Sequence, residues 1–129
     1  MRAMKVPTAL SARLPRLRRA NPNGMAGVSA PVRADRRTKN LTKRLRPGDI
    51  AIIDHVALDR VSAEALVECG VSAVVNAAKS ISGRYPNLGP QLIVEAGIPL
   101  VDEVGPEVFT LVDEGERLRL EGGALLRGD

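Results

Sequence analysis

The chain has 129 residues, a length typical of one domain. Its apolar fraction is 44%, but its aromatic fraction is only 2%, so the expected core is aliphatic. With so few side chains on which bases could stack, we expect no specific nucleic-acid binding. No apolar run approaches the roughly 20 residues of a transmembrane helix, and no signal-peptide pattern is present, so we expect a cytoplasmic protein.

Charge divides the chain into two parts. Residues 1–46 contain 13 of the 19 Lys and Arg residues and one acidic residue, whereas residues 47–129 have a net charge of −8. Residues 1–26 lack a sustained apolar period, so we predict a disordered basic arm there, with an organelle transit peptide as the alternative. Such an arm suits nucleic acid, an anionic membrane face or an acidic partner, or it only aids solubility.

The remaining residues alternate between strand and helix patterns. Pro31 restricts the first strand to a sheet edge. Asp59 or Ser62 is expected to cap the second helix, and Gly70 to end it. The expected elements, in chain order, are a strand at 28–33, a helix at 36–45, a strand at 50–54, a helix within 58–70, a strand at 71–76, a helix at 92–96, a strand at 98–102, a helix at 106–112, and strands at 116–120 and 124–127.

This order predicts an α/β fold. Strands separated by helices pair in parallel, and the Gly122-Gly123 turn joins the last two strands into a hairpin. We therefore expect residues 27–129 to form a single, compact β/α sandwich of mainly parallel strands with a C-terminal β-hairpin.

The segment 77–90, AAKSISGRYPNLGP, is the strongest candidate for a ligand site. It joins a buried strand to a helix N-terminus, where free N–H groups and the helix dipole favour anions. Loops of this kind carry binding residues in many α/β proteins, although ordinary turn chemistry is the alternative. The predicted ligand-binding residues are Ser80, Ser82, Gly83, Arg84, Tyr85, Asn87 and Gly89.

Catalytic motifs are absent from the sequence. There is no phosphate-binding loop with Lys-Ser/Thr, no dinucleotide glycine pattern, no nucleophilic serine elbow and no diagnostic metal-ligand spacing. The one histidine, His55, follows Asp54 at a strand end, but neighbouring strand residues point to opposite faces, so an acid–base pair is not implied. The one cysteine, Cys69, precludes an intramolecular disulfide and is expected to be buried. We therefore expect no catalysis by this chain alone.

Acidic residues gather in the second half of the chain. They form either a solvated face or a docking surface for the basic arm or for the helix at 36–46, within one chain or between copies. The residues concerned are Asp102, Glu103, Glu107, Asp113, Glu114 and Glu116.

Two segments carry a resemblance to a known family. ADRRTKNLTKRLRPGDIAIIDH at 34–55 and AVVNAAKSISGRYPNLGPQLIVEAGIPLVDEVG at 73–105 resemble the N-terminal domain of the SteA family of cytokinetic-ring proteins. SISGRYPNLGP is the most specific string within them. The resemblance implies a longer protein in which a thiamin pyrophosphokinase-like domain and a hydrophobic C-terminal region follow. It also implies a membrane-associated, SteB-like partner and control of peptidoglycan hydrolysis at the septum.

A weaker, fold-level likeness concerns EAGIPLVDEVG at 95–105 and EGERLRLEGG at 114–123. These segments are similar to the swivelling phosphohistidine domain of phosphoenolpyruvate-utilising enzymes. In that domain a histidine near the start of a helix carries the phosphoryl group, whereas the matching SGRYPNLGP has none. The likeness therefore implies a fold rather than phosphohistidine chemistry.

From these observations we expect a non-catalytic interaction or anion-binding module of a SteA-like protein in bacterial cell division and cell separation. The ligand would be a phosphate-containing small molecule, and self-association is a further option. The alternative is the phosphate- or nucleotide-binding part of a thiamin pyrophosphokinase-like transferase whose catalytic domain lies elsewhere. Septal membrane association, through further segments, is implied only by the resemblance.

Overall fold

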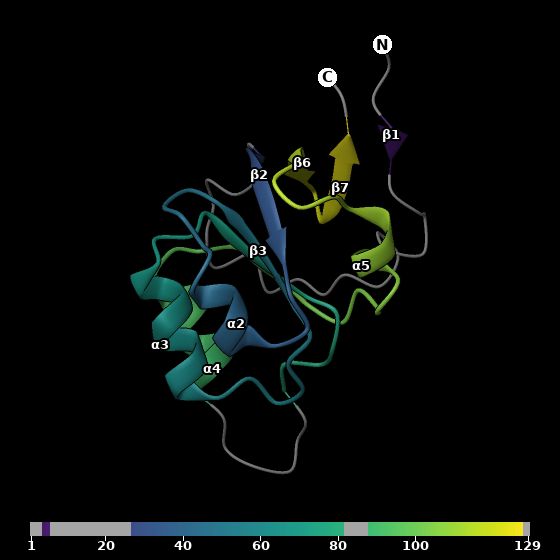
Figure 1. Cartoon of the computed structure of the whole chain (residues 1–129). Coiled ribbons are helices and arrows are strands. Elements are labelled where there is room, and N and C mark those ends of the chain that lie inside the picture. The colour runs from purple at the N-terminus through teal and green to yellow at the C-terminus, as the bar shows by residue number, and fades with distance from the viewer. Residues whose placement is uncertain (1–3, 6–26, 82–87, 128–129) are drawn as a thin grey trace.

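The computed structural model describes residues 4–5, 27–81 and 88–127. The elements within these ranges alternate between strand and helix up to a final hairpin (Figure 1). They are β1 (Met4–Lys5), β2 (Val28–Ala34), α2 (Thr38–Thr42), β3 (Ile50–Ile53), α3 (Arg60–Glu68), β4 (Ala73–Asn76), α4 (Gly89–Glu95), β5 (Leu100–Val101), α5 (Val108–Leu111), β6 (Arg117–Glu121) and β7 (Ala124–Arg127).

The described strands form one sheet in the order β1-β7-β6-β2-β3-β4-β5. The strands β2, β3, β4 and β5 are parallel neighbours, and α2, α3 and α4 are the crossovers between them. The three helices lie together on one side of these strands (Figure 1). The other half of the sheet is antiparallel and contains the β6–β7 hairpin. The predicted α/β class, with its parallel strands and C-terminal hairpin, is confirmed.

The strand β2 lies inside the sheet, so the prediction of an edge strand is wrong. It pairs with β6 over Val28–Pro31 and with β3 over Val32–Ala34. The N–H of Val32 donates to the Glu116 carbonyl, on the β6 side of β2. Because successive backbone N–H groups of a strand point to opposite sides, the nitrogen of Pro31 faces the β3 side. The pairing with β3 begins only at the next residue, so Pro31 is tolerated there. The missing donor therefore costs no ladder hydrogen bond.

Two apolar clusters, one on each face of the parallel strands, form the core. In β3, Ile50 and Ile52 join the cluster beneath α5 and the hairpin, whereas Ala51 and Ile53 join the cluster beneath the helices. All four side chains are fully buried, as expected for a strand covered on both faces. Helices this short are marginal alone. Tertiary burial of Leu41, Leu66 and Ile93 holds them, each side chain contributing roughly 1.5–3 kcal/mol.

The ends of the elements follow local chemistry. Asp59 caps α3, because its carboxylate accepts a hydrogen bond from the Ser62 N–H at 3.2 Å. Gly70 follows with a φ of +74°, which suits glycine after a helix, so both predicted signals are confirmed. The helix α2 and the strand β5 are shorter than expected, and α4 begins at Gly89 rather than at residue 92.

Of the predicted disordered arm, only Met4–Lys5 falls within the described residues, and these two residues pair with β7 as the short strand β1.

Within the described ranges, no helix combines the length and apolarity needed to cross a membrane.

Candidate functional site

The candidate site lies at the carboxyl edge of the parallel strands. Polar segments follow β3, β4 and β5 there, and α/β proteins bind ligands outside this edge. The segment after β4 leads into the predicted ligand loop. Three of its anchoring residues are buried polar side chains: Asn76, Ser80 and Asp102.

Ser80 is a buried anchor at the start of the loop. Its N–H donates to both carboxylate oxygens of Asp102, at 3.0 and 3.1 Å, and its hydroxyl donates to Oδ1 at 2.6 Å. The same hydroxyl accepts a hydrogen bond from Nδ2 of Asn76 at 2.7 Å. Ser80 is one of the predicted ligand-binding residues. In the structure its side chain lies between Asn76, at the end of β4, and Asp102, just after β5, and it fixes the loop to the sheet.

Asp102 is a carboxyl group inside the protein. Burial raises its pKa, while hydrogen bonds from the Ser80 hydroxyl and N–H act in the opposite direction. The pKa of Asp102 is higher in the folded state than in the unfolded state. The fold therefore loses stability as the pH rises above the ordinary pKa of a carboxyl group. The bonds from Ser80 limit this cost.

Asn76, the last residue of β4, joins three segments. Its Oδ1 accepts hydrogen bonds from the N–H groups of His55 and Ala78, both at 3.0 Å, and its Nδ2 also donates to the His55 carbonyl at 2.9 Å. Sequence reasoning missed this residue. The available signal was an amide side chain at the end of an otherwise apolar strand, where burial demands hydrogen-bond partners.

Backbone hydrogen bonds hold residues 77–80 from both sides. Ala57 and Leu58 donate to the carbonyls of Lys79 and Ser80, at 2.8 and 2.9 Å. On the other side, Glu103 donates to Ala78 at 3.2 Å. Among the described residues, Ala57 (φ +52°) and Glu103 (φ +54°) are the non-glycine residues with left-handed backbone, a conformation that costs about 1–2 kcal/mol each. Strain of this kind gathers at functional sites.

The end of the loop is fixed by close packing. Gly89 is buried, and a Cβ atom there would lie 2.2 Å from the Leu58 carbonyl oxygen. The predicted close approach at Gly89 is therefore an approach to this chain's own backbone. Pro90 also removes one N–H from the first turn of α4, which leaves fewer donors for an anion there than the sequence suggested.

The other predicted ligand residues, Ser82, Gly83, Arg84, Tyr85 and Asn87, lie outside the described residues. The described flanks of the loop are exposed: Ile81 is 47% and Leu88 is 51% accessible. Val56 and Val61, after β3 and in the first turn of α3, complete the set of large exposed apolar side chains in the described ranges. Exposed apolar side chains therefore flank the loop on both sides in the sequence.

His55 does not pair with Asp54. Its Nδ1 lies 2.9 Å from the hydroxyl oxygen of Thr38, and its Nε2 lies 2.9 Å from Oδ1 of Asp59. Asp54 instead forms an ion pair with Arg36 at 3.2 Å. A histidine between a carboxylate and a hydroxyl is an arrangement that can activate a nucleophile, but Thr38 is buried. Here the contacts tie α2 to the start of α3.

Several residues of the predicted acidic surface form ion pairs with arginines of the same chain. Glu114 contacts Arg44 at 3.1 Å and Arg33 at 3.7 Å, so the basic segment after α2 does meet acidic residues within the chain, as one alternative predicted. Glu116 pairs with Arg127, and Asp102 is buried with Ser80. Neither these acids nor others in the described ranges form a group of three or more metal-ligating side chains.

Comparison with known proteins adds no relative: no model of a protein family matches the chain, and no curated protein matches it. Conclusions about function therefore depend on the geometry of the carboxyl edge.

Proposed function

We propose that the chain is a non-catalytic binding module that holds a phosphate-containing anion at the loop after β4. One observation carries the proposal. The loop begins at a buried hydrogen-bonded anchor, Ser80, and ends at a close-packed one, Gly89, both at the ligand-binding edge of the sheet. Because both ends of the loop are fixed to the fold, less conformational freedom remains for ligand binding to remove, which favours binding.

The chemistry of the tethered residues suits an anion. Arg84 can make charge-assisted hydrogen bonds, Ser82 and Asn87 add neutral donors, and a glycine such as Gly83 lets a ligand approach the backbone closely. Lys79 is exposed beside Ser80 and adds positive charge at the start of the loop. These groups are the donors that bind phosphate and pyrophosphate oxygens.

The biological setting that we propose is bacterial cell division and cell separation, as part of a SteA-like protein. The most specific string of that resemblance, residues 80–90, is the segment that starts at Ser80 and ends just after Gly89. A family signature located on an anchored loop is expected if the loop binds the ligand or partner. The proposed protein partner is membrane-associated and SteB-like.

Calorimetric titration of the full chain tests the anion site. Inorganic pyrophosphate, ATP and thiamin diphosphate are the probes. Arg84→Ala should weaken binding of the best probe by about 1.5–3 kcal/mol, the range of a hydrogen bond to a charged group. Arg117→Ala, an exposed arginine on β6, is the matched control and should bind as the parent does. No binding by the parent, or equal losses in the two variants, would refute the proposal.

One observation favours the alternative, a part of a pyrophosphokinase-like transferase. His55 lies between the carboxylate of Asp59 and the hydroxyl of Thr38 at the same edge of the sheet. The two functions differ in turnover. The module neither hydrolyses ATP nor transfers pyrophosphate to thiamin, and His55→Ala leaves anion binding nearly unchanged. Sustained product formation that His55→Ala abolishes would establish the transferase instead.

A further inference from the structure

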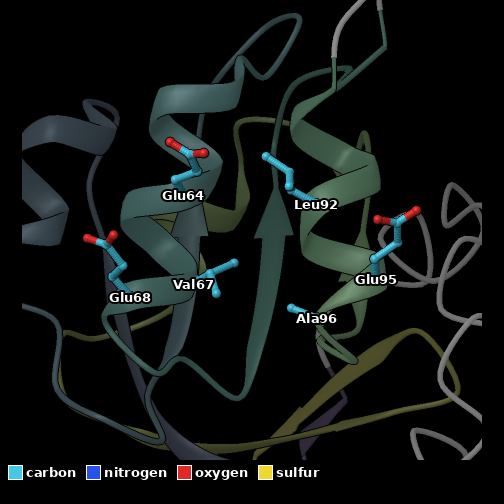
Figure 2. Close-up of a pocket in the computed structure, with 6 residues that line it drawn as sticks. All are labelled: Glu64, Val67, Glu68, Leu92, Glu95 and Ala96. Carbon is cyan, nitrogen blue, oxygen red and sulfur yellow. The ribbon is translucent and has the colours of Figure 1, made fainter.

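A groove separates the outer faces of α3 and α4, toward the helix ends that lie away from the anchored loop (Figure 2). Its volume is about 450 Å³. The residues that line it are Glu64, Val67 and Glu68 from α3, Leu92 and Glu95 from α4, and Ala96, which follows α4 as its C-cap. Beneath the groove, Leu66 and Ile93 belong to one buried apolar cluster, and Val67 and Leu92 of the lining pack against that cluster.

The lining has an apolar floor and an acidic rim. Val67, Leu92 and Ala96 face the space between the helices, and the carboxylates of the three glutamates lie on either side of them (Figure 2). An apolar groove between two helices commonly receives a peptide segment with aliphatic anchors. The rim adds a preference for positive charge on that segment.

The negative charge of the rim is poorly neutralised. Glu64 has a cationic neighbour, Arg60, at 3.0 Å, whereas Glu95 accepts a hydrogen bond from the neutral amide of Gln91 at 2.8 Å. Within the described ranges, Glu68 forms no ion pair. Glu114 and Glu116 differ, because arginines of the folded body already contact them. The groove therefore attracts a basic segment more strongly than those two acids do.

The sequence supplies a segment with the matching chemistry. Residues 1–26 contain six basic residues and no acidic one. Within residues 10–19, LSARLPRLRR, three leucines alternate with four arginines. Residues 6–9 connect this segment to β1, and residues 20–26 connect it to the start of the domain before β2. We propose that the groove between α3 and α4 is the docking site of the chain's own basic arm, with leucines on the apolar floor and arginines beside the glutamates.

The interaction is reversible and salt-dependent, because exposed ion pairs are weak and screened. This inference concerns a different face from the anchored loop and does not depend on the proposed anion binding. An arm held in this way is available for release to an acidic partner.

Methyl NMR spectra of the full chain test the proposal. The test variant replaces Arg13, Arg16, Arg18 and Arg19 with serine. The methyl signals of Val67, Leu92 and Ala96 should shift relative to the parent, whereas those of Val56 and Ile81 should not. A synthetic peptide of residues 8–20, added to this variant, should restore the parent positions at low salt and fail to do so in about 0.5 M salt.

Two further variants, made in the serine-substituted background, locate the peptide. Replacement of Glu64, Glu68 and Glu95 with glutamine should weaken peptide binding at least fivefold. Replacement of Glu103 and Glu107, exposed acids away from the groove, should not change it. Unshifted groove methyls in the arm variant, or a peptide that depends on Glu103 and Glu107 rather than on the groove, would overturn the proposal.

Discussion

Gly89 shows how one small residue sets the position of the candidate site. The backbone carbonyl of Leu58 lies where a side chain at residue 89 would begin, so α4 can start only as close as it does because no Cβ is present. The same contact fixes the end of the ligand loop against the segment that follows β3. A residue expected to approach a ligand thus approaches the chain itself.

Gly89→Ala should destabilise the fold by about 1–3 kcal/mol, the usual cost of overpacking, because the start of α4 must move away from Leu58. Urea denaturation measures the change. Gly115→Ala is the control, since a Cβ there meets open space and the substitution carries only the backbone strain of a φ of +82°. A smaller loss at Gly89 than at Gly115 would contradict the packing account.

The helix α3 depends on one carboxylate for two contacts. Asp59 accepts the Ser62 N–H at the helix start and also contacts His55, which in turn reaches Thr38 in α2. The loss of the cap and the loss of the charge can be separated, because asparagine caps helices about as well as aspartate.

Asp59→Ala should lower the free energy of unfolding by about 0.5–2 kcal/mol, the usual contribution of a helix cap. Asp59→Asn should retain most of that stability and lose only the charge beside His55. Chemical denaturation of the two variants at neutral pH makes the comparison. Equal losses in both would mean that the contact of the carboxylate with His55, and not the cap, is the important one.

The elements differ in how far the sequence could predict them. The cap at Asp59 and the glycine at residue 70 act locally. The end of α3 was therefore predicted at Gly70, and its start at Asp59 or Ser62, of which the structure selects Asp59. The strand β2 was placed at an edge because Pro31 lacks a donor, but the outcome depends on which neighbour pairs on each side, and that is a property of the whole sheet. The roles of Asn76, Ser80 and Asp102 likewise arise from contacts between segments 21 or 22 residues apart. The bonds of Asn76 to Ala78 and Ser80 are local exceptions.

At the scale of the whole molecule, several ion pairs join the basic and acidic parts of the chain, and Arg44 makes one of them. This side chain contacts Asp35 at 2.8 Å and Glu114 at 3.1 Å. The pKa of Asp35 is lowered, first by the Arg37 N–H and then by Arg44. Burial acts to raise the pKa of Glu114, but the Ala34 N–H and Arg44 outweigh it, and the net shift is downward.

These lowered pKa values predict acid lability. A carboxylate whose folded pKa is depressed stabilises the fold above its unfolded pKa, and this stability is lost as the pH falls through the folded value. Stability should therefore decline below about pH 5, the region where unfolded carboxyl groups begin to bind protons. Arg44→Gln should flatten this decline, as measured by melting temperature between pH 7 and pH 3. An unchanged slope would show that Arg44 does not couple the two parts.

The central claim, an anion site on the loop between Ser80 and Gly89, is tested most directly by amide NMR during titration of the full chain with inorganic pyrophosphate. Saturable shifts should centre on the flanks of the loop, at Lys79, Ser80, Ile81 and Leu88, and should be lost in Arg84→Ala. Amides of the β6–β7 hairpin should not move. Shifts confined to the hairpin, or no saturable shift at millimolar pyrophosphate, would contradict the account.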